Sequence, residues 1–447
     1  MSTFIASFIG ELRNTHPGQP EFHQAVYDTL LSAAPALERT PAYQGANILG
    51  RIVEPERVVI FRVPWVDDGG RVRVNRGYRV EFSSALGPYK GGLRFHPGVN
   101  LGVMKFLAFE QTLKNSLTTL PLGGAKGGSD FDTKGRSEGE VMRFCQSFMN
   151  ELFRHLGPRI DIIAGDIGVE RREIGFLFGQ YKRLRNAFDG AVMGKAVGWG
   201  GTVLRPEATG YGCAYFAAEM LATRDESFAG KRVAISGAGT VALHAAEKVV
   251  ALGGRVVAMS DSHGFVVDEA GIEGEKLAFL AAEREGRRGT IREYADRFSG
   301  VSYSQGPHIW HVPVDIAMPC ATQNEMNTQD AAALIANGCR CVCEGATMPV
   351  TADASRVLQE AGILYGPGKA ANAGAAVVSA FETAQNASGL VWSAAAIDRR
   401  LRAMMAQIHR TCLDTAAAYG SPGNYVNGAN LAAFVRLADA VLAQGVV

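Results

Sequence analysis

The sequence has almost no net charge, no long apolar run and no paired cysteine motif. Its 45 lysine and arginine residues balance 44 aspartate and glutamate residues, which leaves a formal net charge of +1. A chain without a basic excess is not expected to bind nucleic acid or an anionic membrane as its main partner. No uninterrupted apolar run reaches the roughly 18 residues that cross a bilayer, so we expect no membrane insertion.

The amino terminus lacks the features of a secretory signal. Residues 1–10 contain no basic residue ahead of their apolar stretch, and no evident cleavage site follows. The seven cysteines show no paired spacing, which suits a reducing compartment. We therefore expect no signal peptide and a cytoplasmic location.

Metal binding is also not expected. Cys339, Cys341 and Cys343 alternate along a strand-like run, and no histidine pair accompanies them. Alternation places their thiols on one face of a strand, where cysteine packs as a small apolar group. The nine histidines are scattered along the chain.

Length and pattern predict two α/β domains. A chain of 447 residues exceeds the usual size of one domain, and 47% hydrophobic residues provide an ample core. Helices and short strands occupy residues 15–200, including 71–80, where basic and apolar residues alternate as in a strand with one buried face. The glycine pair and proline in 200–206 indicate a hinge. From residue 209 strands and helices alternate regularly.

The most informative local feature is a lysine between two pairs of glycines, in 123–128. Glycine allows close backbone approach, so Lys126 can be brought tightly onto a small ligand. Burial and neighbouring positive charge would lower the pKa of its ammonium group into a range useful for acid–base chemistry. The segment lacks the spacing of a phosphate-binding loop. An isolated Gly-Lys-Gly is usually a solvated turn, so the assignment depends on the surrounding residues.

Charged and amide side chains surround this segment in the sequence. Lys90 lies in a second glycine-rich stretch, and Gln111 and Lys114 share one face of a helix predicted over 100–117. Asp166 follows a short apolar run, as a carboxylate at a strand end does. Two lysines would neutralise a substrate with two carboxylates, and the third, with Asp166, would handle protons. These residues alone do not decide which lysine binds which carboxylate.

A dinucleotide-binding pattern begins at residue 232. The apolar strand 232–236 runs into Gly-x-Gly-x-x-Ala at 237–242, which opens a helix that ends near Leu252. The strand 255–260 follows, with Asp261 directly after it. Placed between a strand and a helix, this pattern predicts a Rossmann-type domain that holds a pyrophosphate at the helix amino terminus. Further strands are predicted at 315–318, 340–343 and 363–365.

The choice of nicotinamide cofactor depends on the residues after the second strand. Asp261 alone would bind a ribose 2′-hydroxyl and favour NAD. Ser260 and Ser262 offer hydroxyl donors, and guanidinium groups bind phosphate well. The sequence therefore favours NADP over NAD. The guanidinium groups come from a basic cluster of Arg284, Arg287 and Arg288.

Taken together, these motifs resemble the hexameric glutamate dehydrogenases, in particular the NADP-dependent bacterial type. The resemblance covers nearly the whole chain and includes Tyr89-Lys90-Gly91-Gly92-Leu93-Arg94-Phe95-His96-Pro97 and Phe109-Glu110-Gln111-Thr112-Leu113-Lys114-Asn115-Ser116-Leu117. It extends to 21–26, 61–68, 366–374 and 442–447.

The resemblance implies a domain organisation and a reaction. Residues 1–200, completed by 373–447, would form an α/β substrate-binding and oligomerisation domain, and 201–372 the Rossmann-type dinucleotide-binding domain. The reaction implied is reversible reductive amination of 2-oxoglutarate with ammonia and NADPH to L-glutamate. A homohexamer is the implied assembly.

The resemblance also implies roles for individual residues. Lys126 and Asp166 are the implied catalytic residues: Lys126 activates water and stabilises the developing oxyanion, and Asp166 carries protons to and from the nitrogen. The distal carboxylate would bind Lys90 and Ser379, and the proximal one Lys114, Gln111 and the Gly91 amide, with Ala164 beside them. The implied cofactor-binding residues are Arg205, Thr209, Ser236, Gly237, Gly239, Thr240, Val241, Ser260, Asp261 and Asn372.

Several residues depart from the usual family pattern, and two other functions stay open. Met193 replaces a threonine in the substrate pocket and Ala376 a larger aliphatic residue, while Thr240 and Thr347 replace asparagines near the cofactor. A related leucine or phenylalanine dehydrogenase would share Lys126, but its pocket should lack the charge of Lys90. A non-catalytic subunit would not require Lys126 and Asp166, so the presence of both argues against this function.

Overall fold

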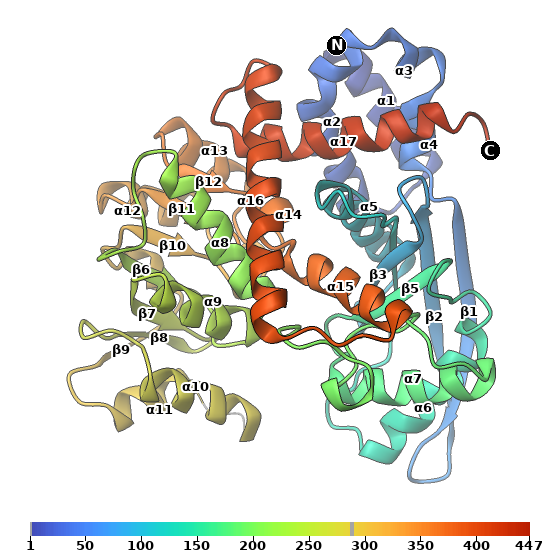
Figure 1. Cartoon of the computed structure of the whole chain (residues 1–447), viewed down its shortest axis with the longest axis horizontal. Coiled ribbons are helices and arrows are strands. Elements are labelled where there is room, and N and C mark those ends of the chain that lie inside the picture. The colour runs from blue at the N-terminus through green and yellow to red at the C-terminus, as the bar shows by residue number, and fades with distance from the viewer. Residues whose placement is uncertain (1, 287–289) are drawn as a thin grey trace. The chain divides into compact units, whose positions relative to one another are not determined.

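The computed structural model describes residues 2–286 and 290–447, without the side chains of residues 2, 3 and 284–286. In the predicted basic cluster, Arg287 and Arg288 therefore lie outside the described residues, as does the side chain of Arg284. Figure 1 shows the strands gathered into two sheets, β1–β5 in one and β6–β12 in the other.

The chain folds into two compact units and passes between them more than once. The first unit contains 1–203, 378–397 and 430–447, and the second contains 204–377 and 398–429. The first crossing falls within the glycine–proline segment 200–206. The predicted organisation assigned the whole of 373–447 to the first domain, whereas in the structure 398–429 make their contacts within the second unit.

The first unit is built on a five-stranded sheet in the order β1-β2-β4-β3-β5. Strands β3, β4 and β5 are parallel, and β2 pairs antiparallel with both β1 and β4. Its elements before the first crossing are α1 (Ser2–Thr15), α2 (Pro20–Arg39), α3 (Pro41–Gly45), α4 (Ile48–Val53), β1 (Arg57–Val66), β2 (Val72–Ser83), β3 (Tyr89–Phe95), α5 (Leu101–Leu117), β4 (Gly124–Ser129), α6 (Glu138–Leu152), β5 (Asp161–Gly165), α7 (Arg171–Arg185) and the 3-10 turn η1 (Val197–Trp199).

Alternation along β3 places hydrophobic side chains on one face of this sheet and the charged side chains of Lys90 and Arg94 on the other. Leu93, Phe95 and Ile163 belong to a core with α6 and α7, in which Phe131 and Phe144 stack at 3.8 Å between ring centroids. Because strand side chains alternate between faces, the intervening residues of β3 and β4 point the other way. Those residues include the lysines singled out in the sequence.

The second unit is a Rossmann-type domain with a seven-stranded sheet in the order β12-β11-β10-β6-β7-β8-β9. Its strands β12, β11, β10, β6 and β7 are parallel, and β8 and β9 continue the sheet as antiparallel strands. Its elements up to residue 371 are α8 (Ala208–Ala222), β6 (Arg232–Ile235), α9 (Thr240–Ala251), β7 (Arg255–Ser260), β8 (Gly264–Val267), α10 (Glu275–Gly286), α11 (Ile291–Arg297), β9 (Ser302–Gln305), η2 (His308–His311), β10 (Ile316–Met318), α12 (Thr328–Ala336), β11 (Cys341–Cys343), α13 (Ala352–Glu360), β12 (Leu364–Gly366) and α14 (Gly368–Ala371).

Three carboxy-terminal helices follow the second sheet: α15 (Gly374–Ser388), α16 (Ala394–Ala418) and α17 (Tyr425–Ala443). Among the described residues, α17 is the one helix long and apolar enough, by length and composition, to cross a membrane. Its polar residues are tied to the first unit, however. Arg436 donates to the carbonyl of Ser116, and Asp439 accepts from the Tyr43 hydroxyl at 2.5 Å. These contacts identify it as a packed core helix.

One strand expectation was wrong in detail. The basic–apolar alternation in 71–80 predicted a strand with one solvated face, but β2 is exposed over its first half and buried over its second. From Tyr78 onward the strand lies between β1 and β4 and packs under α5, so both of its faces are covered.

Candidate active site

Lys126 and Asp166 lie on neighbouring parts of the first sheet and form an ion pair. Lys126 is in β4 and is buried, and its Nζ lies 3.1 Å from Oδ1 of Asp166, which directly follows β5. Arg94, in β3, donates from Nε to the other carboxylate oxygen, Oδ2, at 2.7 Å. The structure thus brings the two predicted catalytic residues together and adds a third charge.

The glycines around Lys126 are required by neighbouring backbone and helix atoms. A Cβ on Gly124 would lie 1.9 Å from Oγ1 of Thr112 in α5, and one on Gly128 would lie 2.1 Å from the Arg94 carbonyl oxygen. Both distances are impossible for a real side chain, so only glycine permits this packing. The expectation that these glycines serve ligand approach is therefore incomplete, because they first allow β3, β4 and α5 to pack closely.

Burial and the neighbouring charges together lower the pKa values of both members of this ion pair. Burial lowers the pKa of Lys126 below its ordinary value, Asp166 opposes that shift, and the Arg94 charge adds to it. Burial on its own would raise the pKa of Asp166, but Lys126 and Arg94 outweigh it and lower this pKa to about 2. Asp166 is consequently ionised at neutral pH, and Lys126 loses its proton more readily than a solvated lysine.

Asn115 links several predicted substrate-binding residues. Its amide nitrogen donates to the carbonyls of Lys90, at 3.1 Å, and Gly123, at 2.6 Å, while its oxygen accepts from Nε2 of Gln111 at 2.8 Å. Lys90 is buried at the start of β3, next to Gly91. Lys114 lies on the same helix as Gln111, one turn along.

Ala164 and Ser379 are connected through Met193. The backbone of Met193 donates to Ile163, and the residue packs against Ile162 and Ala164 at the edge of β5. Its sulfur accepts from the Thr383 hydroxyl at 3.3 Å, and the same hydroxyl lies 3.2 Å from the Ser379 carbonyl, one turn earlier in α15. The residue that departs from the family pattern therefore bridges β5 and the helix that carries Ser379.

A fully buried ion pair fastens the segment that follows Met193 to α15. Nζ of Lys195 lies 3.1 Å from Oε1 of Glu382 in α15, and both side chains are completely buried. The other oxygen of Glu382 accepts from the Gly194 amide at 3.1 Å. Sequence reasoning missed both residues because they are far apart in the chain and belong to no motif.

The glycine-rich loop of the second unit follows β6 as predicted. Gly237 has a positive φ of 87°, and Gly239 precedes the first residue of α9 in extended conformation, with no atom near the position of a Cβ. The amides of Thr240 and Val241 thus begin a helix whose first N–H groups have no intrahelical acceptor. This arrangement fits a bound pyrophosphate.

Two serine hydroxyls that were predicted to bind the cofactor form hydrogen bonds at the glycine-rich loop. Oγ of Ser260 accepts from the Gly237 amide at 3.0 Å, and Oγ of Ser236 accepts from the Cys320 amide at 2.9 Å. The Ser236 hydroxyl also donates to the Glu325 carboxylate, whereas the Ser260 hydroxyl keeps its proton for a further acceptor. The two serines therefore shape the loop, and Ser260 still offers a donor.

Asp261 is engaged by three backbone amides. Oδ1 accepts from His263 at 2.7 Å and Gly264 at 3.0 Å, while Oδ2 accepts from Ile291, the first residue of α11, at 2.7 Å. A carboxylate already satisfied on both oxygens is a weak candidate for binding a ribose hydroxyl. The geometry thus weakens the main argument from sequence for NAD.

The remaining predicted cofactor residues lie in separate segments of the second unit. Arg205 and Thr209 are at the amino end of α8, and Asn372 follows α14. Nδ2 of Asn372 donates to the Ala346 carbonyl at 2.9 Å, whereas its Oδ1 is buried and has no hydrogen-bond donor in the described residues. A buried acceptor without a partner suits a site completed by a ligand carboxamide.

No group of three or more histidine, cysteine, aspartate or glutamate side chains in the described ranges is arranged as a metal site. All seven cysteines are buried free thiols.

Comparison with known proteins identifies the family. Residues 55–183 match the Glu/Leu/Phe/Val dehydrogenase dimerisation domain, and residues 200–445 match the Glutamate/Leucine/Phenylalanine/Valine dehydrogenase domain. The chain belongs to this dehydrogenase family. It is 53% identical over 446 residues to the NADP-specific glutamate dehydrogenase of Salmonella typhimurium, covering 99% of each chain.

Solved glutamate dehydrogenase structures share the fold over the whole dehydrogenase chain. The Plasmodium falciparum glutamate dehydrogenase is similar with a TM-score of 0.98 and 44% identity, covering 100% of this chain and 95% of that one. The Leu-bound hetero-hexameric glutamate dehydrogenase of Thermus thermophilus gives a TM-score of 0.83 at 28% identity, covering 94% and 97%. The two-domain fold is thus that of the dehydrogenase family.

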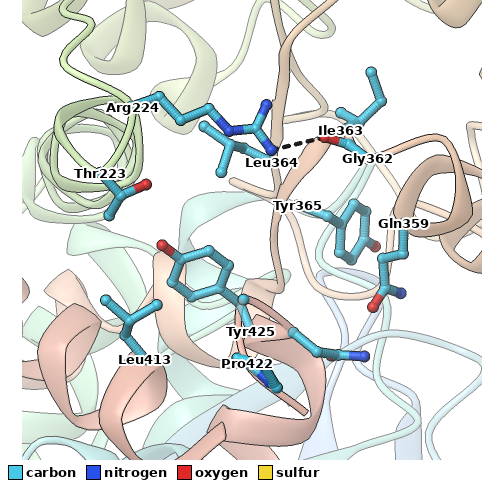
Figure 2. A pocket seen from close by; sticks show the side chains of 12 residues that line it. Thr223, Arg224, Gln359, Gly362, Ile363, Leu364, Tyr365, Leu413, Pro422 and Tyr425 are labelled. Carbon is cyan, nitrogen blue, oxygen red and sulfur yellow. Dashed lines mark hydrogen bonds between the residues drawn. The ribbon is translucent and has the colours of Figure 1, made fainter. Parts of the chain in front are cut away.

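A surface pocket of about 370 Å³ lies elsewhere in the second unit of this dehydrogenase. Figure 2 shows it between the end of α8, the start of β12 and the turn between α16 and α17, with Arg224 bonded to the Gly362 carbonyl at 2.7 Å. It lies at the amino end of β12, whereas the glycine-rich loop follows the carboxyl end of the parallel strand β6. None of the predicted site residues lines it.

Proposed function

We propose that this chain is an NADP-dependent glutamate dehydrogenase that converts 2-oxoglutarate, ammonia and NADPH to L-glutamate, reversibly. The observation that carries the proposal is the buried Lys126–Asp166 pair, in a chain 53% identical over its length to NADP-specific glutamate dehydrogenases. When bound, the nicotinamide supplies or accepts the hydride. The protein binds, orients and moves protons.

Charged and polar side chains of the first unit would bind the substrate. Lys90 and Ser379 are proposed to hold the distal carboxylate, and Lys114, Gln111 and the Gly91 amide the proximal one. The support is that Lys90 is buried and that Asn115 fixes its backbone together with Gln111. A buried ammonium attracts a carboxylate, so this arrangement favours a dicarboxylate.

Lys126 and Asp166 would carry out the proton chemistry. With its pKa lowered by burial, Lys126 can give a proton to the developing oxyanion and activate water at the carbonyl carbon. Asp166, held ionised, can accept a proton from the incoming ammonia and return it, as a relay rather than a store. Ala164, in the strand that ends before Asp166, adds no charge and leaves room for the substrate.

The second unit would bind NADP through its loop and hydroxyl groups. The amino end of α9, with Gly237, Gly239, Thr240 and Val241, is proposed to hold the pyrophosphate. Ser260 would donate to the 2′-phosphate, consistent with an Asp261 carboxylate already occupied by backbone amides. Ser236, Arg205, Thr209 and Asn372 are proposed to complete the site. The functional domains would accordingly follow the two units.

The enzyme is proposed to be a cytoplasmic homohexamer. Its support is the match to the family's dimerisation domain, the hexamer formed by the Thermus thermophilus relative, and an exposed aliphatic patch on β1 and β2. The patch consists of Val58, Ile60, Val66, Val72 and Val74, which are 36–70% exposed. Edge strands with such a patch favour association with another copy. Light scattering should give a mass near six chains for wild type and a smaller one for Ile60→Lys.

The test of the activity is direct. Purified protein should oxidise NADPH in the presence of 2-oxoglutarate and ammonia, and NADH with at least about tenfold lower kcat/KM, because phosphate recognition gains charge-assisted hydrogen bonds. Equal use of both cofactors would overturn the NADP assignment. Absence of turnover with 2-oxoglutarate but turnover with 2-oxo-4-methylpentanoate would assign a leucine-type dehydrogenase instead.

A further inference from the structure

Arg94 lies directly opposite Asp166 in the first sheet. Leu93 pairs with Gly165 of β5, and the Phe95 amide donates to the Ile167 carbonyl at 2.9 Å, so the register on both sides of Arg94 is fixed. On its other side Arg94 pairs with Gly128 of β4. Opposite residues in paired strands point to the same face. The Arg94 side chain therefore belongs to the same face as Lys126, two residues before Gly128.

The three side chains form a closed charge arrangement. Asp166 has two oxygens, and each contacts one cation: Oδ2 contacts Nε of Arg94 at 2.7 Å and Oδ1 contacts Nζ of Lys126 at 3.1 Å. The exposed side-chain fractions are 16% for Arg94, 7% for Lys126 and 24% for Asp166. An arginine keeps its charge throughout the accessible pH range, whereas this lysine exchanges protons.

We propose that Arg94 is a positioning residue for the reaction, holding Asp166 by Oδ2 so that Oδ1 stays directed at Lys126. This inference rests on the proposed function, because it assigns proton transfer to Lys126 and Asp166. When Lys126 turns to the substrate or loses its proton, Asp166 keeps one fixed partner. Without Arg94, the carboxylate would have a mobile lysine as its one cation in this group.

The charge of Arg94 acts on both partners. It stabilises the ionised form of Asp166 and repels the ammonium form of Lys126, so both groups release protons more readily. Arg79 of β2, paired with the buried Asp161, also repels the Lys126 ammonium. Removal of the Arg94 charge should therefore raise both pKa values.

A matched set of variants tests the proposal by kinetics. Arg94→Gln removes the charge, Arg94→Lys restores a charge without the planar contact, and Arg73→Gln serves as control. Arg73 makes a similar contact, Nε to Oδ2 of Asp67 at 2.9 Å, in the same sheet but away from Lys126. The measurement is kcat and KM for 2-oxoglutarate between pH 6 and 10, with wild type run alongside.

We expect Arg94→Gln to lower kcat at least about tenfold, with KM for 2-oxoglutarate changed by no more than a few-fold, and to move the acid limb of the kcat profile to higher pH. Arg94→Lys should recover part of the loss, and Arg73→Gln should match wild type. A Gln variant with wild-type kcat and pH profile would overturn the assignment. If Arg94→Gln does not fold, Arg94→Lys decides, since a wild-type profile there would equally contradict the role.

A second readout does not depend on turnover. Lys126 can be labelled with trinitrobenzenesulfonate as a function of pH and quantified by mass spectrometry. The labelling midpoint should move to higher pH in Arg94→Gln, because a repelling charge has been removed, and should stay in place in Arg73→Gln. An unchanged midpoint would refute the electrostatic part of the proposal. Failure of wild type to use 2-oxoglutarate would refute the function instead.

Discussion

The two units offer different kinds of groups to a negatively charged ligand. In the first, the candidate site is built from charged side chains: the buried Lys90 and Lys126 with the partly buried Arg94–Asp166 pair. In the second, the loop after β6 offers backbone amides at the start of α9 and two serine hydroxyls that brace the loop. A carboxylate is a compact charge, matched by one ammonium, whereas a pyrophosphate spreads its charge over many oxygens and suits a row of amides.

This difference predicts different sensitivity to substitution. The charges in the first unit are carried by side chains, so a single substitution removes a whole charge from the candidate site. In the second unit the binding groups belong largely to the backbone, and a single side-chain change leaves most of them in place. Four predictions, taken from the largest expected effect to the smallest, sharpen or break this contrast.

Lys126→Ala should leave a folded protein with kcat lower by about 10² to 10⁴, because loss of an acid–base or oxyanion-stabilising group has costs on this scale. Folding should persist because β4 is held by its glycines and by strand pairing on both sides. Steady-state kinetics and circular dichroism measure the two properties. More than about a tenth of wild-type turnover would remove Lys126 from the mechanism.

Lys90→Leu should relax the preference for a dicarboxylate. Wild type should use 2-oxoglutarate at least about 10²-fold better than 2-oxohexanoate, since 2-oxohexanoate lacks the distal carboxylate that the buried Lys90 is proposed to bind. The variant should lose most of its activity with 2-oxoglutarate and keep that with 2-oxohexanoate. Should wild type use both within a few-fold, the glutamate assignment would fail, and Met193 would become the first residue to examine.

Ser260→Ala should have a smaller effect, confined to the cofactor. Loss of one hydroxyl should raise KM for NADPH a few-fold to about tenfold, because a hydrogen bond to a charged group contributes about 1.5–3 kcal/mol, in part replaced by neighbours. Values for NADH and 2-oxoglutarate should change little. A change as large as that of Lys126→Ala would contradict the contrast between the units.

The smallest effect concerns pH-dependent stability. In each unit a buried glutamate, Glu81 in the first and Glu344 in the second, has its pKa raised to about 7, mainly by burial. Glu344 is stabilised by the Gly368 amide at 2.6 Å and the Tyr365 hydroxyl, whereas Glu81 has an ion pair with the half-exposed Arg57 but no hydrogen-bond donor in the described residues. The folded state therefore binds more protons than the unfolded one between about pH 4.5 and 7, and stability falls as pH rises through this window.

Glu81→Gln should accordingly increase the free energy of unfolding at pH 8, on the order of 1 kcal/mol, and leave it nearly unchanged at pH 4.5. Glu344→Gln should not stabilise, because its hydrogen bonds to donors would be partly lost. Urea unfolding at the two pH values makes the comparison. Stabilisation of both variants at pH 8 would show that burial alone governs these glutamates.

Elements with a clear period were well predicted from the sequence. The strand–glycine–helix sequence from residue 232 corresponds to β6, the loop and α9, and the predicted helix over 100–117 corresponds to α5. These elements depend on local patterns, namely alternation, helical spacing and glycine placement. The predicted strand 255–260 is β7 with the same bounds.

Contacts between residues that are distant in the chain could not be predicted from the sequence. Lys195 and Glu382 are 187 positions apart, and no local pattern indicates that they meet in a fully buried pair. Asp261 was considered as a ribose ligand because its position after a strand allows it, yet three amides occupy its oxygens. The position of Arg94 could have been predicted from the sequence, because alternation along β3 places Lys90 and Arg94 on the same face.

The buried cysteines allow the transient opening of each unit to be measured separately. Cys145 lies in the core of the first unit, and Cys412 lies in α16 within the second. Burial raises the pKa of both thiols, so neither reacts while its unit stays closed. The rate at which a thiol reagent modifies each cysteine therefore reports how often that unit exposes its interior, and mass spectrometry of the two peptides would time these events separately in one intact protein.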